Sequence, residues 1–185
     1  MSVPIDDPLT RAARRAAAGD RRAAARFVEL SQERVWRACA HLVDPASAED
    51  LAQETYLRAL RGLGGFRGEC AAMAWLATIV RGVCADEIAR RIARRPLGGA
   101  LPHAGDHAEH VATEMLLADL PVDLREAFVL TQVLGFSYAQ AAQVAQVPIG
   151  TIRSRVARAR ARLVEAITEG EASTGVLPAQ VLRKR

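Results

Sequence analysis

Five arginines lie within one stretch of the sequence that contains no acid. Residues 127–164 hold no aspartate or glutamate, so their formal charge is +5. The guanidinium group is planar, permanently charged and suited to contact with phosphate. A helix that is merely soluble usually carries glutamates that support its arginines, so this run indicates a polyanionic partner, for which DNA is the natural choice. The five cations are Arg153, Arg155, Arg158, Arg160 and Arg162.

The arginines fall on the second helix of an expected helix-turn-helix between residues 137 and 163. Ser137 can cap a short first helix, small Ala141 and Ala142 allow close approach, and Pro148 suits a first turn. The second helix then has a packed apolar stripe with arginines on another face. Its start would reach base edges, although spacing does not separate base from phosphate contacts. The candidates for DNA contact are Ser137, Thr151, Arg153, Ser154, Arg155 and Arg158.

The composition predicts an all-helical protein. The 185 residues are rich in alanine, the best helix former, and only 4% are aromatic, whereas strands favour aromatic and β-branched side chains. No apolar stretch approaches the ~20 residues that cross a bilayer. The first residues carry acids where a signal peptide carries cations. We therefore expect a cytoplasmic all-α protein without membrane insertion.

Periodicity and composition divide the chain into two small helical domains. Apolar residues recur at helical spacing after Asp20, after Ser47 and from about Ala74, with Ser47 as the expected cap of its helix. Glycine, proline, histidine and acids then indicate a flexible linker, after which Asp123 is the expected cap of another helix that precedes the helix-turn-helix. The expected order is an extension 1–19, a first domain 20–95, the linker 96–112, a second domain 113–168 and a disordered tail 169–185.

The cysteines and histidines do not suggest a metal site. Cys39, Cys70 and Cys84 have neither CxxC nor HxxxC spacing, so we expect buried thiols rather than a disulfide framework or zinc. The histidines within residues 103–110 fall in the expected linker and should be solvated. No nucleophile elbow or phosphate-binding glycine loop is visible. We expect no catalytic residue, no metal and no cofactor, and therefore not an enzyme.

The order of the motifs resembles the bacterial sigma-70 family of RNA polymerase sigma factors, in its extracytoplasmic-function (ECF) group. The second domain matches in LPVDLREAFVL, GFSYAQAA and VPIGTIRSRVARARARL, and the first in AEDLAQETYLRAL, FRGECAAMAWLATIVR and ADEIARR. The resemblance implies a sigma region 2 helical bundle followed by a sigma region 4 helix-turn-helix that reads the promoter −35 element. An autonomous helix-turn-helix regulator is the alternative, but it would leave the motifs of the first domain without purpose.

The resemblance also implies roles for the first domain. In the family, the helix matching AEDLAQETYLRAL binds the clamp coiled coil of the largest polymerase subunit. Asp50, Gln53 and Glu54 stand at i, i+3 and i+4, so they share one helix face that offers acceptors to basic side chains. Asp50 taken alone is equally compatible with a capping role.

The loop matching FRGECAAM and the helix after it hold the −10 element in this family as separated strands, with one base in a pocket of the loop. Core packing is the alternative for Trp75, which also falls in the apolar stripe. The chain departs from the family pattern at Gly82, where many members carry asparagine, and at Gln140, which replaces the usual acid of SYxEIA. The candidate −10 residues are Phe66, Arg67, Trp75, Thr78 and Arg81.

The expected function is that of a dissociable promoter-specificity subunit. It would bind core RNA polymerase at the clamp coiled coil and the flap, recognise the −10 and −35 elements of promoter DNA and assist melting. The family also implies regulation by an anti-sigma factor, and control at transcription is equally compatible with the sequence.

Overall fold

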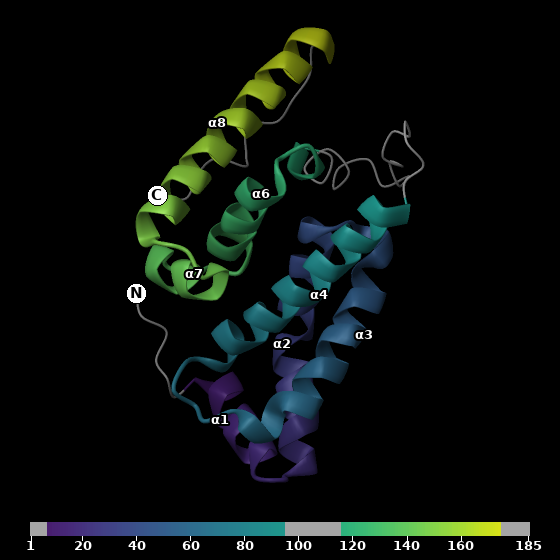
Figure 1. Cartoon of the computed structure of the whole chain (residues 1–185), viewed down its shortest axis with the longest axis vertical. Coiled ribbons are helices and arrows are strands. Elements are labelled where there is room, and N and C mark those ends of the chain that lie inside the picture. Colours follow the sequence, from purple (N-terminus) through teal and green to yellow (C-terminus); the bar gives the residue numbers. More distant parts are fainter. Residues whose placement is uncertain (1–6, 95–115, 175–185) are drawn as a thin grey trace.

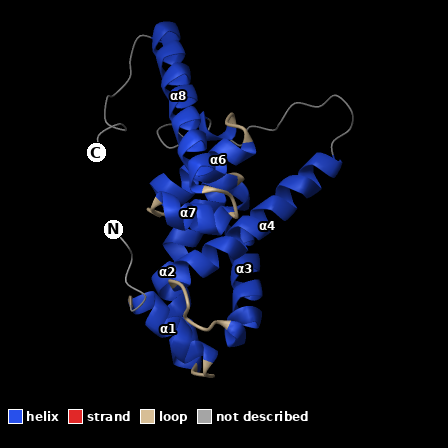
Figure 2. Ribbon diagram, turned by 60° about the vertical axis from the view of Figure 1, so that its left-hand side comes forward, coloured by secondary structure: helices blue, strands red, loops and turns tan. Residues whose placement is uncertain are grey.

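The computed structural model describes residues 7–94 and 116–174, and within these residues it consists of helices, turns and loops (Figures 1 and 2). The predicted all-α class is confirmed. None of the helices in these two ranges is long and apolar enough to cross a membrane. The expected linker 96–112 and its histidines, and the end of the chain from residue 175, lie outside the described residues.

Aspartates cap the first three helices that the structure describes. Asp7 caps α1 (Pro8–Ala17), Asp20 caps α2 (Arg21–Leu42), and Asp44 caps α3 (Pro45–Gly62) by accepting a 2.8 Å hydrogen bond from the Ser47 amide. The prediction that Ser47 caps α3 is therefore wrong, because Pro45 fits the first turn and the cap moves one residue before it. The hydroxyl of Ser47 instead accepts a hydrogen bond from Arg91 on α4 (Ala72–Arg94).

The core of the first domain includes the first helix of the chain. Phe27 of α2 and Leu76 and Val80 of α4 are almost fully buried, and they belong to the same apolar cluster as Leu9 and Ala13 of α1. Residues 1–19 were expected to be an extension outside this domain. The structure packs their helical part against α2 and α4, so α1 contributes to the core.

The second domain contains α6 (Val122–Phe128), a π-helical turn (Val129–Val133), α7 (Tyr138–Ala145) and α8 (Ile149–Thr174). The predicted cap at Asp123 is wrong: α6 begins at Val122 after Pro121, and Asp123 lies in its first turn. The predicted cap of α7 at Ser137 is confirmed. Helix α8 continues beyond the expected end near Ile167, so the tail expected to be disordered from residue 169 begins as helix.

The two domains pack against each other. In Figure 1 the purple-to-teal helices of the first domain lie beside the green α6 and α7 of the second. Leu134 and Ala141 of the second domain join the apolar cluster that contains Phe27. Arg34 Nη2 of α2 donates a 2.7 Å hydrogen bond to the carbonyl of Leu134, so polar contacts accompany the apolar ones.

Candidate nucleic-acid and protein-binding sites

The helix-turn-helix is held by a reciprocal cap at its first helix. The Gln140 amide donates to Ser137 Oγ at 3.2 Å, and Gln140 Oε1 accepts from the Ser137 amide at 2.9 Å. The side chain of Gln140 therefore completes a capping box that an acid would otherwise complete. Ser137 was a candidate DNA contact, and its half-buried side chain is used in this cap. Helix α7 ends at Gln146, which adopts the left-handed conformation with φ 55°.

Apolar packing decides which side of α8 faces outward. Ile152, Val156 and Ala159 are almost completely buried, which confirms most of the predicted stripe. Arg153, Ser154 and Arg158 are exposed on the other side of the helix. Within the ranges that the structure describes, neither Arg153 nor Arg158 forms an ion pair. Their charges are therefore available to an anionic partner.

Arg155 differs from these arginines. Its side chain is only 20% exposed, and Nε lies 3.2 Å from Asp123 Oδ2. The bridge ties α8 to the start of α6, so it orients the helix-turn-helix. Thr151, the remaining candidate on α8, is half-buried, and its carbonyl accepts from Ser154 Oγ at 3.0 Å.

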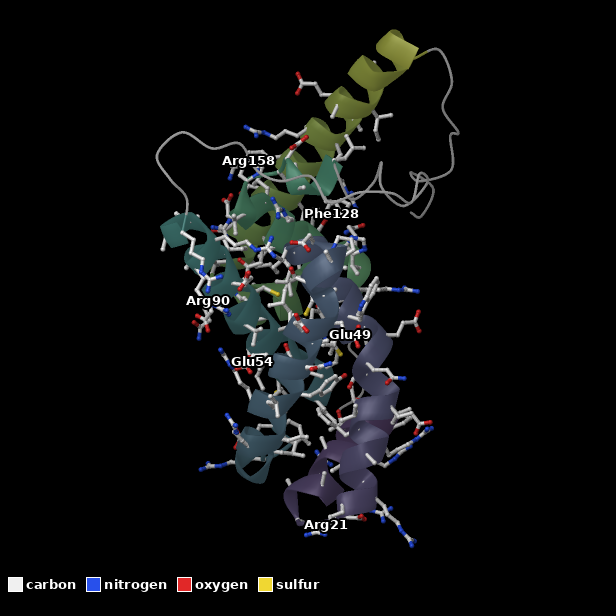
Figure 3. All side chains as sticks on the ribbon, turned by 90° about the vertical axis from the view of Figure 1, so that its right-hand side faces the viewer. Arg21, Glu49, Glu54, Arg90, Phe128 and Arg158 are labelled. Carbon is white, nitrogen blue, oxygen red and sulfur yellow. The ribbon has the colours of Figure 1, made fainter. Side chains whose placement is uncertain are left out.

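A shallow hollow lies beside the exposed arginines of α8. It has a volume of about 250 Å³ and is lined by Arg158, Arg162 and Asp123, among others. Figure 3 shows Arg158 on the second domain, away from the labelled residues of the first. Arg160, on another side of α8, donates a 3.0 Å hydrogen bond to Gln132 Oε1 and so faces the π-helical turn.

An acidic face lies on α3. Asp50 and Gln53 are exposed. The half-buried Glu54, which is labelled in Figure 3, accepts a 2.7 Å hydrogen bond from Arg58 Nε. Since Asp44 caps the helix, Asp50 has no capping role, and the alternative that the sequence left open is excluded. Two exposed leucines on this face were not predicted from the sequence. Leu57 is 50% exposed and Leu60 is 44% exposed, and they follow Gln53 by four and seven residues.

The candidate −10 loop begins at an aromatic cluster. Phe66 is only 7% exposed, and its ring centroid lies 5.4 Å from that of Trp75, which in turn lies 6.4 Å from Phe27. Phe66 therefore anchors the loop in the core and does not present a free stacking surface. Trp75 is half-buried, so it packs in the core and still reaches the surface.

Helix α1 holds the other end of this loop, which the sequence did not predict. Thr10 Oγ1 is fully buried and accepts a 2.9 Å hydrogen bond from the Ala72 amide. Arg14 Nη2 donates a 3.0 Å hydrogen bond to the carbonyl of Gly68. Gly68 has φ +72°, so the backbone conformation favours glycine, and a Cβ there would displace the Arg14 guanidinium, whose Nε would lie 2.3 Å away. The one sequence feature that points to this contact is the i, i+4 spacing of Thr10 and Arg14, which places both on one side of α1.

The remaining −10 candidates lie on or near α4. Arg67 and Thr78 are exposed, and Thr78 Oγ1 donates to the Trp75 carbonyl at 2.6 Å. Arg81 forms a salt bridge with Glu126 of α6. Gly82 has open space around the position of a Cβ, so the asparagine that many family members carry there would fit.

The cysteines agree only in part with the prediction. Cys39 and Cys84 are buried, but Cys70 is exposed because it lies in the loop just before α4. The Cys84 thiol is hydrogen-bonded to Cys39, and this bond together with burial raises its pKa well above the ordinary value. Among the residues that the structure describes, no group of three side chains is arranged to hold a metal ion.

These features define a helical two-domain DNA-binding protein, in which a cationic helix-turn-helix belongs to one domain and an acidic helix face to the other. Residues 27–94 match the family described as Sigma-70 region 2, and residues 110–163 match Sigma-70, region 4. The ECF RNA polymerase sigma factor SigC of Mycobacterium tuberculosis is 45% identical over 86% of this chain and 91% of the relative. The chain therefore belongs to the sigma-70 family, in its ECF group.

Further similarities support this conclusion. The RNA polymerase sigma-H factor of Pseudomonas aeruginosa is 34% identical over 80% of this chain and 88% of the relative. The structure of CnrH in complex with the cytosolic domain of CnrY matches with a TM-score of 0.72 and 26% identity, covering 88% of this chain and 99% of that one. RpoE of Bartonella quintana, in complex with the anti-sigma factor NepR, matches with a TM-score of 0.66 and 30% identity, covering 77% and 95%. The protein is a sigma factor that directs core RNA polymerase to promoters.

Proposed function

We propose that this sigma factor divides promoter-directed initiation among three faces of the molecule. The acidic face of α3 binds the polymerase clamp, the loop 66–71 with α4 holds the −10 strand, and the exposed side of α8 reads the −35 element. One observation carries the proposal: the exposed side chains of α3 and α8 have opposite charge and lie on different domains. Opposite charges suit opposite partners, a basic protein coil and a polyanionic duplex.

On α8, Arg153 and Arg158 make the contacts to the −35 duplex. Both are exposed, both lie in the first three turns of the helix, and no acid on α8 precedes Glu165. Helix starts of this kind enter the major groove in helix-turn-helix proteins. Arg155 acts by positioning, because its bridge to Asp123 holds α8 against α6.

On the first domain, Arg67, Thr78 and Arg81 face the single strand, while Phe66 and Trp75 support the loop. A turned-out base needs a sharply turned loop, and Gly68, which is buried beside Arg14, allows this turn through its left-handed backbone conformation. Arginine and hydroxyl groups then neutralise and orient the phosphates.

On α3, Asp50, Gln53 and Glu54 accept hydrogen bonds from the clamp coil, and the exposed Leu57 and Leu60 bury apolar area beside them. A polar patch next to exposed leucines is typical of a protein interface with a small apolar centre. We also propose that the protein works in the cytoplasm, has no catalytic activity of its own, and contacts the polymerase flap through its second domain.

Run-off transcription with core polymerase, together with separate binding measurements, tests this division. Asp50→Ala with Gln53→Ala should weaken core binding and leave −35 duplex binding unchanged. Arg153→Ala or Arg158→Ala should do the opposite, with a loss of ~1–3 kcal/mol for a base contact. Arg160→Ala is a matched control, since it removes the same charge from another side of α8. Equal defects from both sets, or tight duplex binding without polymerase, would contradict the proposal.

A separate inhibitory protein is part of the proposal. The CnrH and RpoE structures contain the cytosolic domain of CnrY and the anti-sigma factor NepR. For this chain, we propose an anti-sigma factor that competes with core polymerase. Co-purification followed by displacement with core polymerase would test it, and a complex that core polymerase fails to displace would contradict it.

A further inference from the structure

A cationic groove on the α1–α2 hairpin is used by none of the three faces. The hollow has a volume of about 400 Å³ and is lined by four apolar residues and four arginines. Two of the arginines come from α1 and two from α2, each pair at i, i+4 spacing. We call this surface, formed by Arg11, Arg15, Arg22 and Arg26, the arginine groove.

The charge of the groove is a local feature of the chain. Residues 7–29 contain six arginines and three acids, which gives a formal charge of +3. The next part of the same domain, residues 30–62, contains five acids and four arginines, which gives −1. A general excess of arginine in the sequence therefore does not account for the groove.

The ion pairs within the hairpin leave this charge in excess. Arg15 pairs with Asp20 and Arg26 with Glu29, each at 2.7 Å, and both arginines are more than half exposed. Exposed pairs of this kind stabilise a protein by only ~0–1 kcal/mol, so breaking one to bind a phosphate costs little. Arg22 is exposed and forms no ion pair among the described residues.

Helix α1 contributes side chains to both the groove and the proposed −10 loop. Arg14 stands three residues after Arg11, so the two lie next to each other on the helix surface, and the Arg14 guanidinium is hydrogen-bonded to Gly68 in the loop. Thr10, one turn before Arg14, accepts the hydrogen bond from the Ala72 amide at the end of the loop. A strand that leaves the loop on this side therefore meets the cationic side of α1.

We propose that the arginine groove binds phosphates of the single-stranded promoter DNA that adjoins the segment held by loop 66–71. This inference rests on the proposed function of that loop. Side chains at i and i+4 stand about 5–6 Å apart at Cβ, on the scale of the repeat of an extended nucleic-acid strand. Among the apolar residues of the lining only Leu30 has a large side chain, so the groove offers little of the apolar area that an amphipathic peptide helix would bury. Guanidinium groups around such a lining suit a chain of phosphates.

The test uses holoenzyme reconstituted with the full-length chain and two labelled single strands from a promoter mapped by run-off transcription. One oligonucleotide contains the −10 element alone, and the other extends it by about ten nucleotides on each side. The test variant is Arg22→Ala with Arg26→Ala. The matched control is Arg61→Ala with Arg37→Ala. Like Arg22, Arg61 is exposed and forms no ion pair among the described residues, and like Arg26, Arg37 forms an exposed ion pair, here with Glu33.

The test variant should lose affinity only for the extended strand. Two lost phosphate contacts reduce the slope of log affinity against log salt concentration by ~1.4. The ratio of wild-type to variant affinity for the extended strand should therefore fall about sevenfold between 50 and 200 mM salt. The control should behave as the wild type with both strands. Thermal unfolding should be unchanged for both variants, since all four side chains are exposed.

Other outcomes have definite meanings. Equal losses in test and control variants, or wild-type affinity of the test variant for the extended strand, would overturn the inference. A loss of core-polymerase affinity with normal strand binding would show that the groove docks an acidic protein instead, which also overturns it. Failure of the proposed loop function is distinguishable, because wild-type holoenzyme would then not bind the −10 oligonucleotide.

Discussion

Arg81 of α4 and Glu126 of α6 form a salt bridge that connects the two domains. Glu126 is only 13% exposed, whereas Arg81 is 40% exposed, so the carboxylate holds the arginine from the more buried side. Arg81 lies one turn beyond Thr78, on the helix that we assign to the −10 strand. In this arrangement the Glu126 carboxylate pairs with the Arg81 guanidinium, which we propose to contact DNA.

Replacement of Glu126 by alanine should therefore increase binding of the free protein to −10 single-stranded DNA. A partly exposed ion pair contributes up to ~1 kcal/mol, so the expected gain is up to about fivefold. Fluorescence anisotropy with a labelled −10 strand measures it. Glu165→Ala removes an exposed acid of the same domain and should have no effect. Unchanged affinity of the Glu126 variant would show that the bridge does not compete with DNA.

The Gly82→Asn variant should bind the −10 strand more tightly and unfold at a higher denaturant concentration. The Cβ position at Gly82 is open, so asparagine fits without displacing a neighbour. Asparagine is a better helix former than glycine by a few tenths of a kcal/mol. Gly82→Ala is the control, because it gains helix propensity but offers no amide to DNA. Equal strand affinity for the two variants would indicate that no contact forms at this position.

Local signals in the sequence predicted much of this structure, and contacts distant in sequence account for most of what was missed. Periodicity located α2 and α4, and the Ser137 cap of α7 depends only on nearby residues. The caps at Ser47 and Asp123 were wrong because a neighbouring proline starts each helix earlier.

Two contacts show why the rest escaped prediction. Thr10 meets Ala72 across 62 residues, and Arg81 meets Glu126 across 45. Each residue type alone fits an exposed helix face, so no periodic pattern indicates the pair. The support that α1 gives to the proposed −10 loop, and the packing of the two domains against each other, follow from tertiary contacts rather than from local propensity.

The Thr10→Val variant should destabilise the first domain by ~1–3 kcal/mol and weaken −10 strand binding. Valine fills the same volume but leaves the buried Ala72 amide without its acceptor. Thr10→Ser keeps the hydroxyl and should retain the strand affinity of the wild type, although it loses a methyl group. Urea unfolding and strand anisotropy, both at a temperature where the variants remain folded, measure the two effects. Normal strand binding by a destabilised valine variant would show that the hydrogen bond is purely structural.

The last prediction concerns the pH dependence of stability at Asp44. Burial opposes ionisation of this carboxyl, but hydrogen bonds from Arg91 and the Ser47 amide outweigh it and hold the pKa of Asp44 below its ordinary value. A lowered pKa in the folded state means that the unfolded chain binds this proton more readily. The stabilisation is therefore complete above the unfolded pKa of ~3.9 and is lost as pH falls through the lower folded pKa.

The Asp44→Asn variant isolates this contribution, because asparagine caps a helix almost as well as aspartate but carries no charge. The wild type should be more stable than the variant by ~1–2 kcal/mol at pH 7, and the difference should shrink as pH falls below ~4. Urea unfolding between pH 3 and 7 measures it. Asp86→Asn, which disrupts only an exposed pair with Arg58, should have little effect at pH 7. A difference between wild type and Asp44→Asn that stays constant with pH would mean that the charge of Asp44 does not stabilise the fold.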